Sequence, residues 1–135
     1  MNKNMTQEDR DLLIKDLSTR LPYGVKVLYD TQIFEVQYIE PMYGELKLLD
    51  NETYTLPIEE VKPYLFPLSS MTKEQKEEFN SYFTSVPYYG DNEHEHVVPY
   101  YFVELLMEFF HKNHIDNNGL IQKGLANDAT NLNIY

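Results

Sequence analysis

The sequence contains no cysteine, which excludes disulfides, a thiolate nucleophile and cysteine-based zinc sites. Its five glycines are dispersed, and none begins the Gly-Lys-Ser/Thr pattern of a phosphate-binding loop. No apolar run approaches the roughly 20 residues of a membrane helix, and residues 1–15 lack the apolar core of a secretory signal. We therefore expect a cytoplasmic protein that does not span a membrane.

Positive charge is scarce as well. Eleven Lys and Arg stand against 22 Asp and Glu, which gives a formal net charge of −11. Such a surface repels phosphate backbones unless cations are concentrated in a patch, and Lys73, Lys76 and Lys112 are scattered among acidic residues. Direct nucleic-acid binding is thus not expected. A solvated acidic face is the simpler interpretation, and the alternative is a decoy that imitates nucleic acid in the groove of a basic protein.

Aromatic residues are abundant, with 12 Tyr and 7 Phe in 135 residues. The hydrophobic content of 42% is sufficient for a packed core. The length predicts one domain, residues 1–135, with a β subregion over 24–65 and a helical subregion over 71–126.

The first half of the chain changes from a helical to an alternating pattern. Residues 6–19 have the signals of an amphipathic helix, with Thr6 as N-cap and a stripe of leucines. Beyond Pro22 and Gly24, four short segments of alternating apolar residues predict an antiparallel meander. Residues 58–64 resemble a single helical turn that closes this sheet. A small SH3-like barrel is the favoured arrangement, and a flatter sheet covered by helices is the alternative.

The second half is predicted to be helical. Thr72 and Gln75 form a capping-box pattern for a helix to about Tyr82, and Pro99 suits the first turn of a second, strongly apolar helix. A short helix over 120–126 and a loose tail complete the prediction. The expected fold class is α+β: an N-terminal helix, a small four-stranded antiparallel SH3-like barrel or sheet, two longer helices and a short C-terminal helix.

Residues 86–101, VPYYGDNEHEHVVPYY, place two of the four histidines in an acidic segment. Together with His111 and His114, His94 and His96 offer imidazole ligands that suit zinc, manganese or iron. The Glu-x-x-His spacing of di-iron bundles also occurs twice, but such bundles need four long helices. The simpler interpretation is a solvated loop between two helices, and a His/carboxylate metal-dependent enzyme is kept as an alternative.

Other signals of catalysis are missing from the sequence. The five serines lack the context of a nucleophile elbow. The Asp-Asn-Asn-Gly run at 116–119 lacks the closing glutamate of a calcium loop, so it predicts a turn. We expect no catalytic residue and no cofactor.

The tyrosines are the remaining functional signal, because so many rings cannot all be deeply buried in a domain of this size. Exposed tyrosine supplies a large contact area for protein recognition. Tyr88, Tyr89, Tyr100 and Tyr101 are the predicted contact residues. The alternative is that most tyrosines are half-buried with hydrated hydroxyls.

Three phrases carry a resemblance to a known group of proteins. They are RLPYGVKV at 20–27, KPYL at 62–65 with SSMT at 69–72, and NHxDxxGLIxKGLA at 113–126. In this order they resemble a group of small uncharacterised proteins of gut Bacteroidetes and of their phages and mobile elements. The resemblance covers nearly the whole chain. It implies a bacterial or phage cytoplasmic origin, but no functional residue, since no activity is known for the group.

The sequence thus predicts a non-catalytic protein-interaction module that modulates a host or phage component through an unknown protein partner. The acidic decoy and the metal-dependent enzyme remain the two alternatives.

Overall fold

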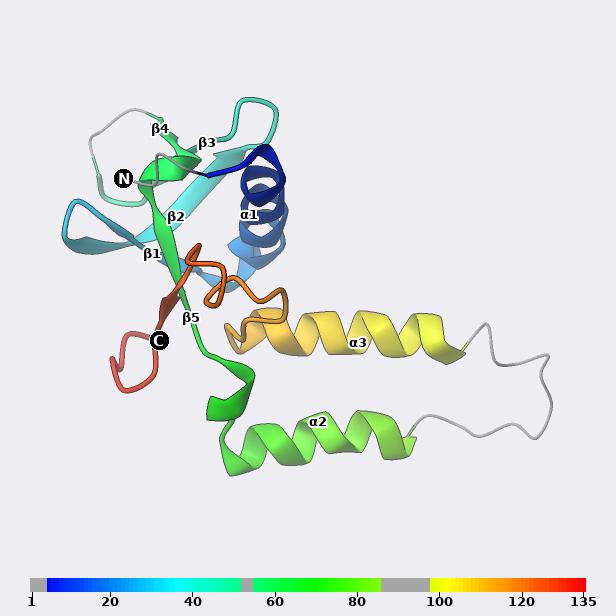
Figure 1. Cartoon of the computed structure of the whole chain (residues 1–135). Helices are drawn as coiled ribbons and strands as arrows, with labels where there is room; N and C mark the ends of the chain where they lie inside the picture. Colours follow the sequence, from blue (N-terminus) through cyan, green and yellow to red (C-terminus); the bar gives the residue numbers. More distant parts are fainter. Residues whose placement is uncertain (1–4, 52–54, 86–97) are drawn as a thin grey trace.

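The computed structural model describes residues 5–51, 55–85 and 98–135 and shows an α+β fold (Figure 1). Helix α1 leads into a sheet, two longer helices follow, and the last strand returns to the sheet. Three short 3₁₀ helices, η1 (Leu21–Tyr23), η2 (Ile58–Glu60) and η3 (Leu68–Ser70), join these elements. The others are α1 (Gln7–Arg20), β1 (Lys26–Tyr29), β2 (Gln32–Glu40), β3 (Glu45–Leu48), β4 (Leu56–Pro57), β5 (Lys62–Leu65), α2 (Lys73–Ser85), α3 (Val98–Lys112) and β6 (Asn127–Asp128).

The predicted N-terminal helix is confirmed. The Thr6 hydroxyl accepts a hydrogen bond from the backbone N–H of Asp9 at 3.1 Å, which caps the first turn of α1. Leu13 and Leu17 are completely buried against the sheet, so the leucine stripe does face the core. Gly24 ends the segment with a φ of +75°, a conformation that glycine adopts without steric cost.

The sheet has six strands in the order β4-β3-β2-β1-β5-β6, and it is mixed because β5 and β6 run parallel. The first three predicted strands exist as β1 to β3. The fourth, predicted over residues 53–56, overlaps β4 at Leu56, and residues 53–54 lie outside the described chain. The expected four-stranded antiparallel SH3-like barrel or sheet is nevertheless wrong in strand number and in topology. Strand β5 was missed because Lys62-Pro63-Tyr64-Leu65 contains a proline, a residue that normally marks an edge or the end of a strand.

The predicted helix over 120–126 and the loose tail are also wrong. Residues 120–126 form turns, because both carboxylate oxygens of Asp116 accept hydrogen bonds from the backbone N–H groups of Leu120 and Ile121 at 2.9 Å. The tail then forms β6. Its last residue, Tyr135, is held in place by the β1 and β5 backbones, accepting from Lys26 N at 2.8 Å and donating to Tyr64 O at 2.9 Å.

Two hydrophobic clusters divide the molecule. The larger one lies between α1 and one face of the sheet and includes Leu13, Val27, Leu46 and Leu65, all completely buried. The smaller one forms around Phe109 and joins α2 to α3. Figure 1 shows these two helices side by side, extending away from the sheet. In the described ranges, no helix combines the length and the apolar character required to cross a membrane.

Candidate functional site: an apolar two-helix arm

We call helices α2 and α3 together the arm. The first turn of α2 is stabilised by residues close to each other in the sequence. The capping box at the start of α2 is formed as predicted. Gln75 N donates to the Thr72 hydroxyl at 3.1 Å, and Thr72 N donates to the Gln75 side-chain oxygen at 2.9 Å. The two helices lie side by side and extend away from the sheet (Figure 1).

Aromatic rings hold the arm together. Phe79 of α2 lies 5.9 Å from Phe109 and 6.2 Å from Phe110 of α3, measured between ring centroids. Further from the body, Phe83 meets Phe102 at 4.8 Å with the rings at 71°. Such edge-to-face pairs contribute about 0.5–1.5 kcal/mol each beyond the apolar area they bury. The ladder of rings gives a packed contact between the helices along most of their described length.

A polar cluster lines one edge of the arm. Glu78 forms an ion pair with Lys112 at 2.8 Å and accepts a hydrogen bond from the Tyr82 hydroxyl at 2.5 Å. The hydrogen bond from Lys112 and that from Tyr82 lower the pKa of Glu78, whereas desolvation and the same carboxylate raise the pKa of Tyr82 to about 12. The ion pair is 40% exposed, so it contributes little more than about 0.2–1 kcal/mol. It mainly fixes the relative position of the two helices.

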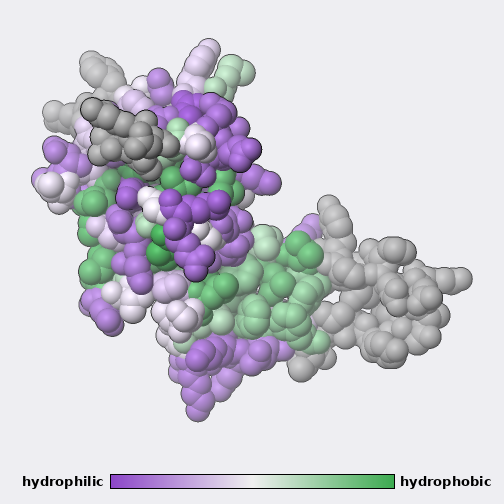
Figure 2. Space-filling view, in the orientation of Figure 1, coloured by the Kyte–Doolittle hydropathy of each residue, from purple (hydrophilic) through white to green (hydrophobic). Residues whose placement is uncertain are grey.

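Large apolar side chains remain exposed on the arm. Phe83 of α2 is 52% exposed although its ring touches Phe79 and Phe102, and Val103 of α3 is 50% exposed. Figure 2 shows hydrophobic residues gathered over the two helices, with hydrophilic residues along the lower edge of the arm. Contiguous exposed apolar surface of this kind is typical of interaction sites.

The arm is about as acidic, per residue, as the rest of the chain. Residues 73–85 and 98–112 contain three Lys and five Glu, a net charge of −2 out of the −11 of the whole chain. The arm holds about a fifth of the residues and about a fifth of the net charge, so charge does not distinguish it from the remaining chain.

The segment that enters α2 and the segment that leaves α3 are hydrogen-bonded to each other next to the sheet. Phe66, just before η3, donates its N–H to His114 O and accepts from Asp116 N, each at 2.8 Å. These bonds form a parallel bridge between the residue that leads into α2 and the segment that leaves α3. The direction of the arm is consequently set by the sheet.

A buried ion pair supports this junction from α1. Arg20 is completely buried and donates to both carboxylate oxygens of Asp16 at 2.8 and 3.2 Å. Its Nη2 also donates to Ile115 O at 2.7 Å and to Asn117 Oδ1 at 2.8 Å. Asn118 Nδ2 donates to Asp16 at 2.8 Å. The network links α1 to the segment after α3, so its role is to position the arm.

The two described histidines lie in different environments. His114 stacks on the Tyr135 ring at 3.6 Å and 13°. Burial, and the nearby cations Arg20 and Lys26, lower its pKa to about 4. His111 lies on α3 and contacts Thr19 of α1. Its pKa is also lowered, by burial first and then by the Arg20 cation.

The contact between Thr19 and His111 does not form an activated nucleophile. The Thr19 hydroxyl donates its proton to Asp16 O at 2.7 Å. The hydroxyl proton is thus directed at Asp16 O, and His111 Nε2 lies 3.3 Å from the hydroxyl oxygen. A general base for Thr19 is thus not provided by this histidine.

The predicted site residues fall only partly within the described chain. Tyr88 and Tyr89, like His94 and His96, lie outside it. Tyr100 and Tyr101 belong to the first turns of α3, at the end of the arm remote from the sheet, and their side chains also lie outside the described part. His111 contacts Thr19, whereas His114 stacks on Tyr135, so the two imidazoles do not share a site. Within the described ranges, no group of three or more His, Asp and Glu side chains is placed to hold a metal ion.

Sequence reasoning did not identify the buried Arg20–Asp16 pair or the exposed faces of Phe83 and Val103. A signal for the pair was present, since Asp16 and Arg20 stand four residues apart on one helix, a spacing that allows an ion pair. The neighbouring residues in the sequence do not indicate that the side chains of Asp16 and Arg20 are both buried. The ring of Phe83 contacts Phe79, but half of its surface is solvent-accessible.

No protein-family model, no curated protein and no solved structure matches this chain. The resemblance to the Bacteroidetes and phage group accordingly stays a prediction.

Proposed function

We propose that this protein is a cytoplasmic, non-catalytic protein-interaction module that contacts its partner through the arm. The observation that supports this function most directly is the half-exposed apolar surface around Phe83 and Val103, held on two helices that are braced by aromatic contacts. Modulation of a host or phage component would follow from occupation of a surface on that partner.

The partner that fits this surface is a protein presenting an apolar helix or groove. An apolar helix face docks by burying side chains spaced three and four residues apart, which is how helix-in-groove recognition works. Full burial of a side chain such as Phe or Val contributes about 1.5–3 kcal/mol, so the exposed halves of Phe83 and Val103 could each add roughly 1 kcal/mol.

The experiment that tests this proposal compares Val103→Glu with Met42→Glu. Val103 has no aromatic partner in the described part of the chain, so its replacement preserves the ladder of rings. Met42 is 79% exposed on the connection between β2 and β3, remote from the arm, and serves as the matched control. Both variants and the wild type are used to capture partners from nuclease-treated lysate of the native host at low and at high salt.

We expect the wild type and Met42→Glu to retain the same stoichiometric partner at both salt concentrations, and Val103→Glu to lose it. Loss of capture at high salt, with no effect of Val103→Glu, would instead identify the acidic decoy, since charge-driven binding weakens with ionic strength. Metal analysis of the untagged protein tests the metal-dependent alternative. A further variant with Gly and Ser at residues 91–96 shows whether that segment contributes to capture.

A further inference from the structure

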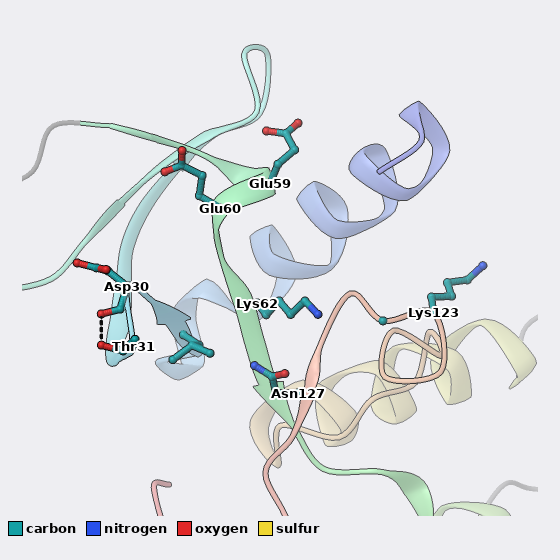
Figure 3. Close-up of a pocket in the computed structure, with 9 residues that line it drawn as sticks. Asp30, Thr31, Glu59, Glu60, Lys62, Lys123 and Asn127 are labelled. Atoms are coloured by element: carbon teal, nitrogen blue, oxygen red, sulfur yellow. Dashed lines mark hydrogen bonds between the residues drawn. The ribbon is translucent and has the colours of Figure 1, made fainter. Parts of the chain in front are cut away.

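A groove separate from the arm is lined by residues of β1, β5 and β6 and of the turns next to them. Its volume is about 550 Å³, and it is formed by the turn between β1 and β2, by η2 and β5, and by residues 123–127. Figure 3 shows Asp30 and Glu60 on one flank of β5, Lys123 on the other flank, and Lys62 and Asn127 between them. The groove thus has an acidic flank and a basic flank.

Strand pairing explains the acidic flank. The antiparallel register of β1 and β5 places Leu28 opposite Lys62. Asp30 follows Leu28 by two residues and Glu60 precedes Lys62 by two, so both carboxylates leave the sheet at the same end. Neither side chain forms an ion pair with another described residue. Glu59, by contrast, is already paired with Arg10.

The basic flank has unused hydrogen-bond donors. In the described ranges, no carboxylate pairs with Lys62 or Lys123. The side-chain nitrogen of Asn127 is buried and lacks an acceptor within the same part of the chain. A buried amide N–H without a partner costs about 1–3 kcal/mol, so an acceptor delivered by a ligand would be favourable.

One wall of the groove is built from a strained turn. Asp30 and Thr31 both have positive φ, 48° and 66°, and threonine is seldom found in this region because its side chain is branched at Cβ. A backbone held in such a conformation is often associated with a binding site. Asp30, in this turn, lines the groove on its acidic flank (Figure 3).

We propose that this groove binds a small zwitterion, a free amino acid or a short peptide. Asp30 and Glu60 receive the ammonium group, and Lys62, Lys123 and the Asn127 amide receive the carboxylate. The volume lies within the range of about 300–1,000 Å³ that is usual for small-molecule sites. A simple anion would leave both carboxylates without a counter-charge, and a simple cation would leave the lysines and the buried amide without an acceptor.

The first test uses the unmodified protein and a matched set of ligands. Amide chemical shifts of isotopically labelled protein are followed during titration with free amino acids, dipeptides and tripeptides, and with the same molecules acetylated at the amine or amidated at the carboxylate. We expect a zwitterion to bind with a dissociation constant of about 0.1–1 mM, since few charge-assisted contacts are available. The shifts should cluster at Leu28, Lys62 and Asn127.

The blocked ligands decide whether both ends are recognised. Acetylation and amidation should each weaken binding about tenfold or more, because each removes one charged contact. Tighter binding of dipeptides or tripeptides than of single amino acids would identify a peptide as the natural ligand, and the reverse would identify a free amino acid. The proposal is overturned if no zwitterion binds at about 10 mM, or if both blocked forms bind as well as the free ones.

Variants provide a second, independent measurement. Lys62→Met should weaken zwitterion binding about tenfold, and Glu60→Gln should have a similar effect on the ammonium side. Lys73→Met, an exposed change at the start of α2, is the control that should leave binding unchanged. Equal binding by all variants, with unaltered spectra elsewhere, would also overturn the assignment. None of these outcomes depends on the arm, so failure here leaves the proposed function intact.

Discussion

Replacement of Arg20 by methionine tests the role of the buried ion pair. The change would leave the Asp16 carboxylate, 1% exposed, with Asn118 as its one remaining side-chain donor among the described residues. It would also remove the hydrogen bonds that Ile115 O and Asn117 now accept. Removing one partner of a buried pair costs about 3–5 kcal/mol because the other charge is left uncompensated. That is a large share of the roughly 5–15 kcal/mol that stabilises a typical domain.

The measurement is urea unfolding followed by circular dichroism at pH 7. With a typical slope of about 1–3 kcal/mol per molar urea, we expect the midpoint of Arg20→Met to fall by roughly 2 M. The double variant Asp16→Asn, Arg20→Met should be less destabilised than Arg20→Met alone, since no buried charge remains. A loss below about 1 kcal/mol for Arg20→Met, or equal losses for the single and double variants, would refute this account of the junction.

Three other changes have outcomes that follow from the structure. Because His114 titrates at about 4 when folded and near 6.5 when unfolded, stability present above pH 6.5 is lost as the pH falls towards 4. His114→Asn should therefore shrink the difference in urea stability between pH 7 and pH 5 by up to about 2 kcal/mol. Thr31→Gly should raise the urea midpoint, with a gain of about 1 kcal/mol from the relieved φ of +66°. Gly44→Ala should cost more than Gly119→Ala in the same assay. Both glycines have positive φ, but a methyl group at residue 44 would meet the Arg10 guanidinium, whereas one at residue 119 would meet open space.

Elements specified by nearby residues could be predicted from the sequence. The Thr6 cap, the Thr72–Gln75 capping box and the alternation through β1 to β3 depend on residues a few positions apart. Tyrosine exposure was also anticipated, since no described tyrosine is buried.

Features that require distant parts of the chain could not be predicted in the same way. Strand β6 consists of two polar residues, which carry no strand pattern of their own. It forms by pairing with β5, where Asn127 lies beside Tyr64, 63 positions earlier in the chain. The burial of Arg20 depends on Ile115 O, 95 residues away. Phe83 is half-exposed although its ring contacts Phe102 of α3, and helical periodicity alone does not predict that degree of exposure. The contact role of Tyr88, Tyr89, Tyr100 and Tyr101 stays a prediction.

The arm has a hydrophobic cluster separate from that of the sheet, so its length can change without a change in the packing of the sheet. Each helical residue adds about 1.5 Å, so two extra turns in both helices would extend the arm by roughly 11 Å and return the same faces to each other. The bond between Phe66 and His114 and the buried Arg20 would be unchanged, because they fix only the junction. Insertions in the arm alone would thus change its length, and the sheet and the junction would stay as they are.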